Sequence, residues 1–287
     1  MDKISQVIQR KRKTAIFPIV CADHCARLLN MKLSEVAKDG DKLAFALEYG
    51  YRFYQYDMVL VFSDPYVEAQ TSSSLDRTEE IIKAASILKQ KLTVPVFVSI
   101  KGPFTLASFL IGIEQFLKDL LSNEKRIKNA IDTALKFQIK YLEKLLKLGV
   151  NIFIGDPMAS ISVISPNLFE RFAYQPLQIL IKKIKDRNLI AGIHICGKTK
   201  PILPMLDELG ADILSIEDIT PKTNTLKMGG VATDTIFSGN EEKLTEEIKK
   251  ALNEPYLILA TACDVPMTTD PQNIKLMIEI AQRYRMK

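Results

Sequence analysis

Residues 189–197 have the sequence Leu-Ile-Ala-Gly-Ile-His-Ile-Cys-Gly, a short apolar run that ends in metal-binding residue types. Segments with the apolar spacing of amphipathic helices lie on either side of it, at 166–187 and 200–209. A short apolar run between two such segments is typical of a buried strand between two helices. This stretch therefore predicts a helix, a strand at 189–195 and a second helix.

The same alternation continues in both directions along the chain. Apolar runs predict seven strands, at residues 15–20, 57–62, 94–100, 151–156, 189–195, 212–216 and 256–261. An eighth strand is expected at 228–232, where two glycines lower the strand propensity. Amphipathic segments predict helices at residues 41–55, 74–91, 104–112, 124–148, 166–187, 200–209, 241–252 and 271–284.

Alternating strands and helices indicate the α/β fold class, because a parallel neighbour strand is reached only through a crossover connection. Eight such units favour a closed (β/α)8 barrel, the TIM barrel, over an open doubly wound sheet, although apolar periodicity alone does not distinguish the two. No linker rich in Gly, Pro or Ser divides the chain. We expect residues 1–287 to form a single barrel domain.

The composition limits the classes of function. Apolar residues make up 47% and charged residues 25%, the balance of a soluble enzyme with a packed core. The formal charge of +5 includes no run of five like charges, so nucleic acid is not an expected partner. No apolar segment approaches the length of a membrane span, and no long apolar segment follows the basic residues 10–13. We expect a cytoplasmic protein whose four cysteines are reduced.

Polar residues follow five of the expected strands. In a parallel barrel these positions meet at one end, where the active site forms. They are Ser63-Asp64, Asp156, His194 with Cys196, Glu217-Asp218, and Cys263-Asp264.

The His194-x-Cys196 pair carries the most chemistry. Residues i and i+2 of an extended strand point to the same side, so both side chains could bind one ion, and Cys263 could complete the set. One imidazole and two thiolates suit Zn²⁺, and three protein ligands leave a fourth position for substrate. Glu217 could occupy that position at rest. The alternative is a small buried cysteine beside a hydrogen-bonded core histidine, and the pair alone does not exclude it.

Three further residues allow two interpretations. Asp64 and Asp156 could act as acids or as hydrogen-bond acceptors for a substrate, or they could cap the following loop or helix. Lys101 precedes Gly-Pro-Phe-Thr, where an anionic group could meet backbone N–H groups and the lysine, or where a plain strand-to-helix turn could form.

Cys21, His24 and Cys25 resemble a second metal cluster, with the two cysteines one helical turn apart. A short helical segment whose cysteines pack as small apolar residues explains the same spacing, and we favour that interpretation.

Four segments together resemble the uroporphyrinogen decarboxylase superfamily across nearly the whole chain. They are Val61-Phe62-Ser63-Asp64, Gly102-Pro103-Phe104-Thr105-Leu106-Ala107-Ser108, the stretch from Gly149 through Asp156-Pro157 to Ser165-Pro166, and Asp270-Pro271-Gln272-Asn273-Ile274. Within that superfamily, the segment 194–199 with Cys263 resembles the zinc-dependent methylcobamide:coenzyme M methyltransferases and related corrinoid methyltransferases. This resemblance also implies a (β/α)8 barrel.

Departures from the decarboxylase pattern point to the same branch. The stretch 17–22 lacks the arginines with which the decarboxylases bind substrate carboxylates. Phe109 stands in place of their catalytic tyrosine, and Cys263 in place of their C-terminal histidine. One departure puts contacts of the seventh strand in doubt, because Gly229-Gly230-Val231-Ala232 replaces the family's Gly-Asn-x-Asp.

The resemblance implies an enzyme, a methyltransferase that uses zinc to activate a small thiol such as coenzyme M. The thiol would take a methyl group from a methylated corrinoid carried by a partner protein. Asp64 or Asp156 would orient the thiol or accept its proton. Alternatives are transfer from a methylated or methoxylated donor to a corrinoid protein, tetrapyrrole decarboxylation, and a non-catalytic zinc-holding partner of a corrinoid protein.

Overall fold

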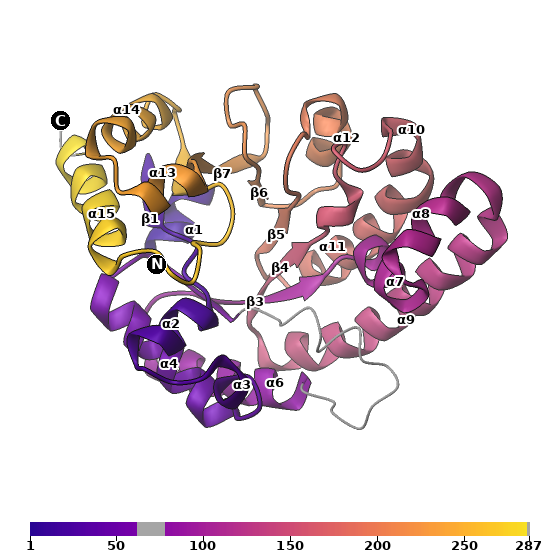
Figure 1. The fold of residues 1–287 in the computed structure, drawn as a ribbon, viewed down its shortest axis with the longest axis horizontal. Helices are drawn as coiled ribbons and strands as arrows, with labels where there is room; N and C mark the ends of the chain where they lie inside the picture. The colour runs from indigo at the N-terminus through magenta and orange to yellow at the C-terminus, as the bar shows by residue number, and fades with distance from the viewer. Residues whose placement is uncertain (62–77, 286–287) are drawn as a thin grey trace.

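Eight parallel strands form one curved sheet in the computed structural model, which describes residues 1–61 and 78–285. Neighbours in the sheet follow the order β1-β8-β7-β6-β5-β4-β3-β2, and helices surround it (Figure 1). The expected (β/α)8 barrel is confirmed. The strands are β1 Thr14–Phe17, β2 Val59–Val61, β3 Val96–Lys101, β4 Asn151–Gly155, β5 Ala191–His194, β6 Ile213–Ser215, β7 Leu226–Val231 and β8 Leu257–Thr261.

The long expected helices are present at nearly the expected bounds. Asn123 and Asn240 cap two of them by accepting backbone N–H bonds, and Gly149 ends one in the left-handed conformation at φ 69°. The α-helices are α1 Lys3–Ile8, α2 Ala22–Leu28, α3 Leu33–Val36, α4 Gly40–Tyr54, α6 Thr78–Lys91, α7 Pro103–Ile111, α8 Ile113–Ser122, α9 Glu124–Leu148, α10 Pro166–Leu168, α11 Gln175–Lys185, α12 Leu203–Glu208, α13 Thr233–Ser238, α14 Glu241–Ala251 and α15 Pro271–Arg285.

The expected helix at 166–187 differs from its observed form. A π-helical segment, η2 Phe169–Tyr174, separates α10 from α11. Pro176 follows this segment. A proline inside a helix has no N–H to donate to the carbonyl of the residue four positions earlier, and its ring crowds that carbonyl. The wider π turn accommodates the proline without ending the helix.

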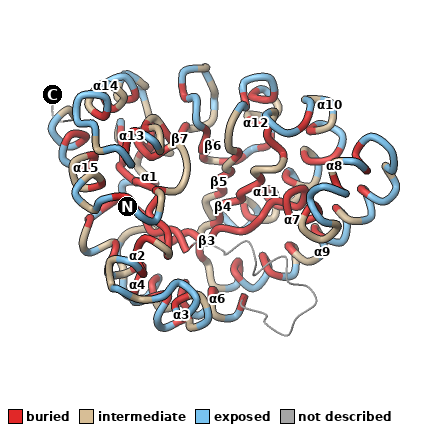
Figure 2. The backbone as a smooth tube through the Cα atoms, viewed as in Figure 1, coloured by how far each residue is buried: buried red, intermediate tan, exposed pale blue. Residues whose placement is uncertain are grey.

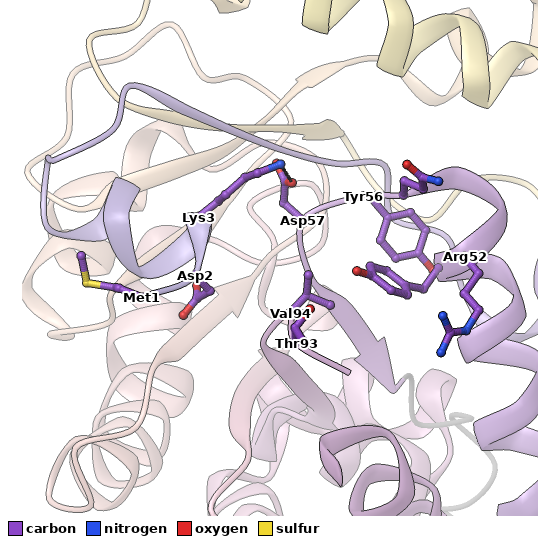
Figure 3. A pocket seen from close by; sticks show the side chains of 10 residues that line it. Met1, Asp2, Lys3, Arg52, Tyr56, Asp57, Thr93 and Val94 are labelled. Atoms are coloured by element: carbon purple, nitrogen blue, oxygen red, sulfur yellow. Dashed lines mark hydrogen bonds and ion pairs between the residues drawn. The ribbon is translucent and has the colours of Figure 1, made fainter. Parts of the chain in front are cut away.

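The barrel closes between β1 and β2 through one residue, Asp57. Within the described residues these two strands share no ladder, but Asp57 links them. Its backbone N–H donates to Ile16 O at 2.9 Å, and its carboxylate accepts the Ile16 N–H at 2.8 Å. Lys3 Nζ contacts the same carboxylate at 2.6 Å (Figure 3). A buried, fully bonded aspartate therefore replaces strand pairing at this seam.

Buried residues run along the strands and the inner helix faces, whereas the outer faces are exposed (Figure 2). In the part of the chain that the structure describes, no helix is long and apolar enough to cross a membrane. A cavity of about 560 Å³ lies where β2 and β3 begin, beside α1 and Asp57 (Figure 3). It is at the end of the barrel opposite the expected active site, so it belongs to the seam.

Candidate metal centre

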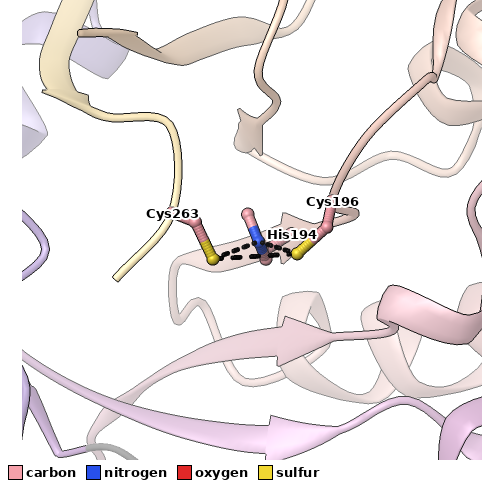
Figure 4. Close-up of side chains that lie close together, drawn as sticks. All are labelled: His194, Cys196 and Cys263. Carbon is pink, nitrogen blue, oxygen red and sulfur yellow. Dashed lines mark hydrogen bonds between the residues drawn. The ribbon is translucent and has the colours of Figure 1, made fainter. Parts of the chain in front are cut away.

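His194, Cys196 and Cys263 come together at the carboxyl end of the strands (Figure 4). His194 Nε2 lies 2.9 Å from Cys196 Sγ and 3.7 Å from Cys263 Sγ, and the two sulfur atoms are 3.8 Å apart. Among the described residues, these three form the only group of His, Cys, Asp or Glu side chains placed to hold a metal ion together. The sequence thus identified residues that lie 67 positions apart but meet in space.

The donor set fits zinc. Tetrahedral zinc with Zn–S bonds of about 2.3 Å and Zn–N bonds of about 2.1 Å places neighbouring donor atoms about 3.5–3.8 Å apart. The separations of Cys263 Sγ from the other two donor atoms, 3.7 and 3.8 Å, match these values. The His194–Cys196 separation of 2.9 Å is that of a hydrogen bond. A small widening of this pair would complete three corners of a tetrahedron.

A serine on the neighbouring strand holds the imidazole. His194 and Ser215 are register partners in β5 and β6, and His194 Nδ1 lies 3.0 Å from Ser215 Oγ. When the hydroxyl oxygen accepts the Nδ1–H, the lone pair of Nε2 faces the two sulfur atoms. The sequence analysis did not include Ser215, although it is the one hydroxyl side chain in the run Ile-Leu-Ser-Ile.

The loop that carries Cys196 is held from both sides. Gly197 adopts a φ of +70°, and a Cβ there would lie 2.5 Å from Ser162 Oγ, so this position requires glycine. Lys198 N–H donates to Ser162 Oγ at 3.0 Å. On the other side, Gly197 N–H donates to Glu217 Oε1 at 2.6 Å. The expected fourth ligand therefore contacts the cysteine loop and is not part of the three-residue group, and its metal coordination stays a prediction.

The two thiols share their protons unequally. A hydrogen bond with Cys196, followed by contacts with His194, lowers the pKa of Cys263 to about 4, although burial acts in the opposite direction. The same hydrogen bond, together with burial, raises the pKa of Cys196. Burial alone would lower the pKa of His194, but the hydrogen bond to Cys263 and its charge raise it. These contacts favour the thiolate form within the centre, the form of cysteine that binds metals.

Asp156 is fully buried beside the start of α7. Its Oδ1 accepts hydrogen bonds from the Thr105 backbone N–H at 2.7 Å and from the Thr105 hydroxyl at 2.5 Å, and its side chain fills the space above Gly102. Its Oδ2 is buried and has no hydrogen-bond partner among the described residues. Burial raises the pKa of Asp156 to about 6, against the effect of the Thr105 bonds. The carboxylate of Asp156 thus occupies the backbone N–H of Thr105 at the start of α7. A role for Asp156 in binding substrate stays a prediction.

Lys101 and His194 lie in one row across the barrel. Lys101 pairs with Gly155, and Gly155 pairs with His194, so all three positions face the same side of the sheet. Among the described residues, no atom would lie within 4 Å of a Cβ on Gly155. No described residue therefore fills the position of Gly155, between Lys101 and the imidazole in this row. Lys101 itself is buried, and ligand binding by it stays a prediction.

Asp64 lies outside the described residues, so its role stays a prediction.

Cys21 is buried just before α2, and Cys25 is buried within it. His24 Nε2 bonds to Tyr54 Oη at 2.7 Å, and its Nδ1 lies 3.2 Å from Met267 O. The favoured interpretation of this cluster as packing fits these contacts.

The barrel and the His, Cys, Cys centre define an α/β enzyme-like scaffold, and comparison with known proteins gives its family. Residues 69–284 match the family model described as Uroporphyrinogen decarboxylase (URO-D). The chain belongs to the uroporphyrinogen decarboxylase family.

Named relatives support the branch that the sequence resembled. The chain is 28% identical over 222 residues to the methylcobamide:CoM methyltransferase MtaA of Methanosarcina barkeri, a match that covers 73% of this chain and 65% of that protein. It is 24% identical to the methylcobamide:CoM methyltransferase MtbA of Methanosarcina acetivorans, with 96% of each chain covered. A solved structure described as a methyltransferase from Methanosarcina mazei shares the fold, with a TM-score of 0.85, 20% identity, and coverage of 98% of this chain and 97% of that one.

Proposed function

We propose that this protein is a zinc-dependent methyltransferase that moves a methyl group from a methylated corrinoid, carried by a partner protein, to a small thiol such as coenzyme M. The observation that carries this proposal is the convergence of His194, Cys196 and Cys263 at the active-site end of the barrel. The similarity to proteins named methylcobamide:CoM methyltransferases supports it.

Each residue has a proposed part. His194, Cys196 and Cys263 would hold the zinc ion, with Ser215 fixing the imidazole. When bound, zinc acts as a Lewis acid that favours the thiolate form of the acceptor and sets its direction. Glu217 would occupy the fourth position without substrate and return to Gly197 when the thiol binds.

The open space beside Gly155 is where the methyl group would be presented to the thiol. The row that runs through Gly155 ends at Lys101, whose ammonium group would bind an anionic part of the corrinoid. Asp64 and Asp156 would orient the thiol or accept its proton. In the transfer a sulfur–carbon bond forms as the cobalt–carbon bond breaks. The electron pair of the broken bond stays on cobalt as Co(I), and the thiol proton is released.

The test combines metal content with turnover. Purified wild-type protein is expected to contain about one zinc ion, as a single three-ligand site requires, and to demethylate methylcobalamin when 2-mercaptoethanesulfonate is supplied. Cys263→Ala is expected to lose both the zinc and the activity. Cys25→Ala, a cysteine buried away from the centre, is the matched control and should keep both. Full activity in Cys263→Ala would contradict the proposal.

A further inference from the structure

Cys196 and Cys263 belong to loops that leave two separate strands, β5 and β8, yet their thiols meet (Figure 4). The two Sγ atoms are 3.8 Å apart and hydrogen-bond to each other. A disulfide bond has an S–S length of about 2.0 Å, so the two sulfur atoms would have to approach by about 1.8 Å. Each Sγ is one rotatable bond away from the backbone, and rotation about that bond in each residue can supply the movement. The geometry therefore allows the two thiols to bond to each other.

The backbone holds both thiols in this arrangement. Cys263 lies between Ala262 and Val265, whose backbone N–H groups donate to β7 at 2.7 Å and to the segment after β1 at 2.9 Å. The loop of Cys196 is fixed through the N–H of Gly197. Two groups that are already held next to each other react faster than the same groups free in solution. The two cysteines are therefore arranged to react with each other in preference to a second small molecule.

The other two cysteines of the chain differ from this pair. Cys21 and Cys25 are buried, with exposed fractions of 4% and 0%, whereas Cys196 and Cys263 are both partly exposed. Burial raises the pKa of Cys25 to about 12 and also raises the pKa of Cys21, so both stay protonated thiols. Oxidation of cysteine follows exposure and thiolate character. A small oxidant should therefore react at the metal centre and spare the buried cysteines.

We propose that Cys196 and Cys263 are a redox modification site, at which small disulfides convert the two thiols into one reversible intramolecular disulfide. Sulfur atoms joined in a disulfide no longer supply thiolates, and His194 is then the one member of the three-residue group that could still bind zinc. Zinc binding and disulfide formation therefore exclude each other. Only this competition rests on the proposed function, since the disulfide itself requires no metal.

The oxidation consists of two thiol–disulfide exchanges. In the first, one cysteine attacks a small disulfide, forms a mixed disulfide and releases one small thiol. In the second, the other cysteine attacks the protein sulfur of the mixed disulfide, and the second small thiol leaves. The cysteine pair loses two electrons and two protons, and the small disulfide gains both as it becomes two thiols.

The first test needs no metal and no turnover. The reduced, zinc-free full chain is incubated with bis(2-hydroxyethyl) disulfide, a small neutral probe. Remaining thiols are blocked with N-ethylmaleimide after unfolding, and the protein is digested without reductant for mass spectrometry. The expected main product is a peptide pair linked through Cys196 and Cys263, with maleimide on Cys21 and Cys25. Four free thiols, or mixed disulfides without the linked pair, would overturn the proposal.

Two variants test which cysteines take part. Cys196→Ser removes the partner of Cys263, so Cys263 should stay as a mixed disulfide with the probe. Cys25→Ala is the matched control and should give the same linked peptide pair as wild type. Circular dichroism checks that both variants are folded. A wild-type linked pair that contains Cys21 or Cys25 would also overturn the proposal.

The second test measures the competition with zinc. When free zinc is held at about ten times its dissociation constant, the rate of disulfide formation should fall about tenfold, because only the metal-free fraction reacts. Without excess zinc, oxidation of the loaded protein should release about one zinc ion per disulfide, as a single site requires. A chromogenic chelator measures this release, and a phosphine reductant should restore zinc uptake.

The two proposals fail separately. Equal oxidation rates with and without zinc would contradict the competition and the zinc binding on which the proposed function depends. A linked peptide pair in a protein that shows no methyl transfer keeps the modification site and rejects the proposed function. Methyl transfer by a protein that gives no linked pair rejects the modification site alone.

Discussion

Two buried aspartates at opposite ends of the barrel are used in different ways. At the amino-terminal end, both carboxylate oxygens of Asp57 accept hydrogen bonds, one from Lys3 and one from the Ile16 N–H. At the carboxyl end, Asp156 bonds through Oδ1 only, and its Oδ2 has no partner among the described residues. Nearby, the three donor atoms of the metal centre contact chiefly one another.

The contrast separates polar groups that hold the fold together from polar groups that keep binding capacity. A buried oxygen without a partner lowers stability, and a barrel accepts that cost at the end where chemistry takes place. Substitutions at the two ends should therefore affect different properties, stability at one end and binding at the other.

The largest expected effect on stability is at the seam. Asp57→Ala leaves the buried Ile16 N–H without an acceptor, and we expect it to lower the free energy of unfolding by about 2–4 kcal/mol. Chemical denaturation measures this loss. Lys3→Ala is the control, because Lys3 is half-exposed and its ion pair should contribute less than about 1 kcal/mol. Equal stability of Asp57→Ala and wild type would remove the distinction between the two ends.

A pH-dependent effect is expected at Asp156. Burial raises its pKa from 3.8 to about 6, so the folded state retains a proton that the unfolded state releases as the pH rises from about 4 to about 6. Wild-type stability should fall relative to Asp156→Asn across that window, by up to about 3 kcal/mol. Denaturation at several pH values measures the difference between the two proteins. A difference between wild type and Asp156→Asn that stays constant across this window would refute the assignment.

Ser215→Ala should weaken metal binding more than folding. Without the hydroxyl the imidazole loses the partner of Nδ1, and zinc affinity should fall about 10–100-fold, as is usual when such a partner is removed. Competition with a chelator measures the affinity, and nitrogen NMR of zinc-free protein reports the His194 tautomer. Ser215→Thr, which keeps the hydroxyl, should restore both readouts. An unchanged affinity in Ser215→Ala would show that Ser215 only fills space.

The smallest effect is expected at two glycines that face the barrel interior. Among the described residues, a Cβ on Gly155 meets no atom, so Gly155→Ala should stabilise the strand by about 0.5–1 kcal/mol. The added methyl group should also reduce the room beside His194 and lower the rate of methyl transfer. Gly192→Ala is the contrasting variant, because its Cβ would collide with the ring of Phe153 and lower stability. Thermal melting and the methylcobalamin assay compare them, and a Gly155→Ala protein with unchanged turnover would place the reacting methyl group elsewhere.

Much of the fold follows from local patterns in the sequence. Apolar periodicity located all eight strands, including β7, whose glycines disfavour a strand but which is held by ladders to β6 and β8 on both sides. Periodicity did not reveal α8, because Gly112 ends one helix and begins another at a φ of +93°, a conformation that depends on packing. The role of Asp57 also depends on long-range closure of the barrel, which residue spacing does not encode.

The candidate centre was predictable for a related reason. His194 ends β5, and Cys196 and Cys263 lie just beyond the ends of β5 and β8. Parallel strands bring such positions together. Ser215 was missed because a single serine at the end of an apolar run gives no local sign of its partner across the ladder.

The ladder between β1 and β8 has a consequence for synthesis of the protein. Residues 14–17 leave the ribosome well before residues 257–261, the strand with which they pair, are made. Until then β1 has hydrogen-bonding groups on that side without their final partner, and Asp57 offers the only nearby link that the described residues provide. The emerging chain therefore exposes an open strand edge until residues 257–261 are made, the condition under which chaperones protect a protein from aggregation.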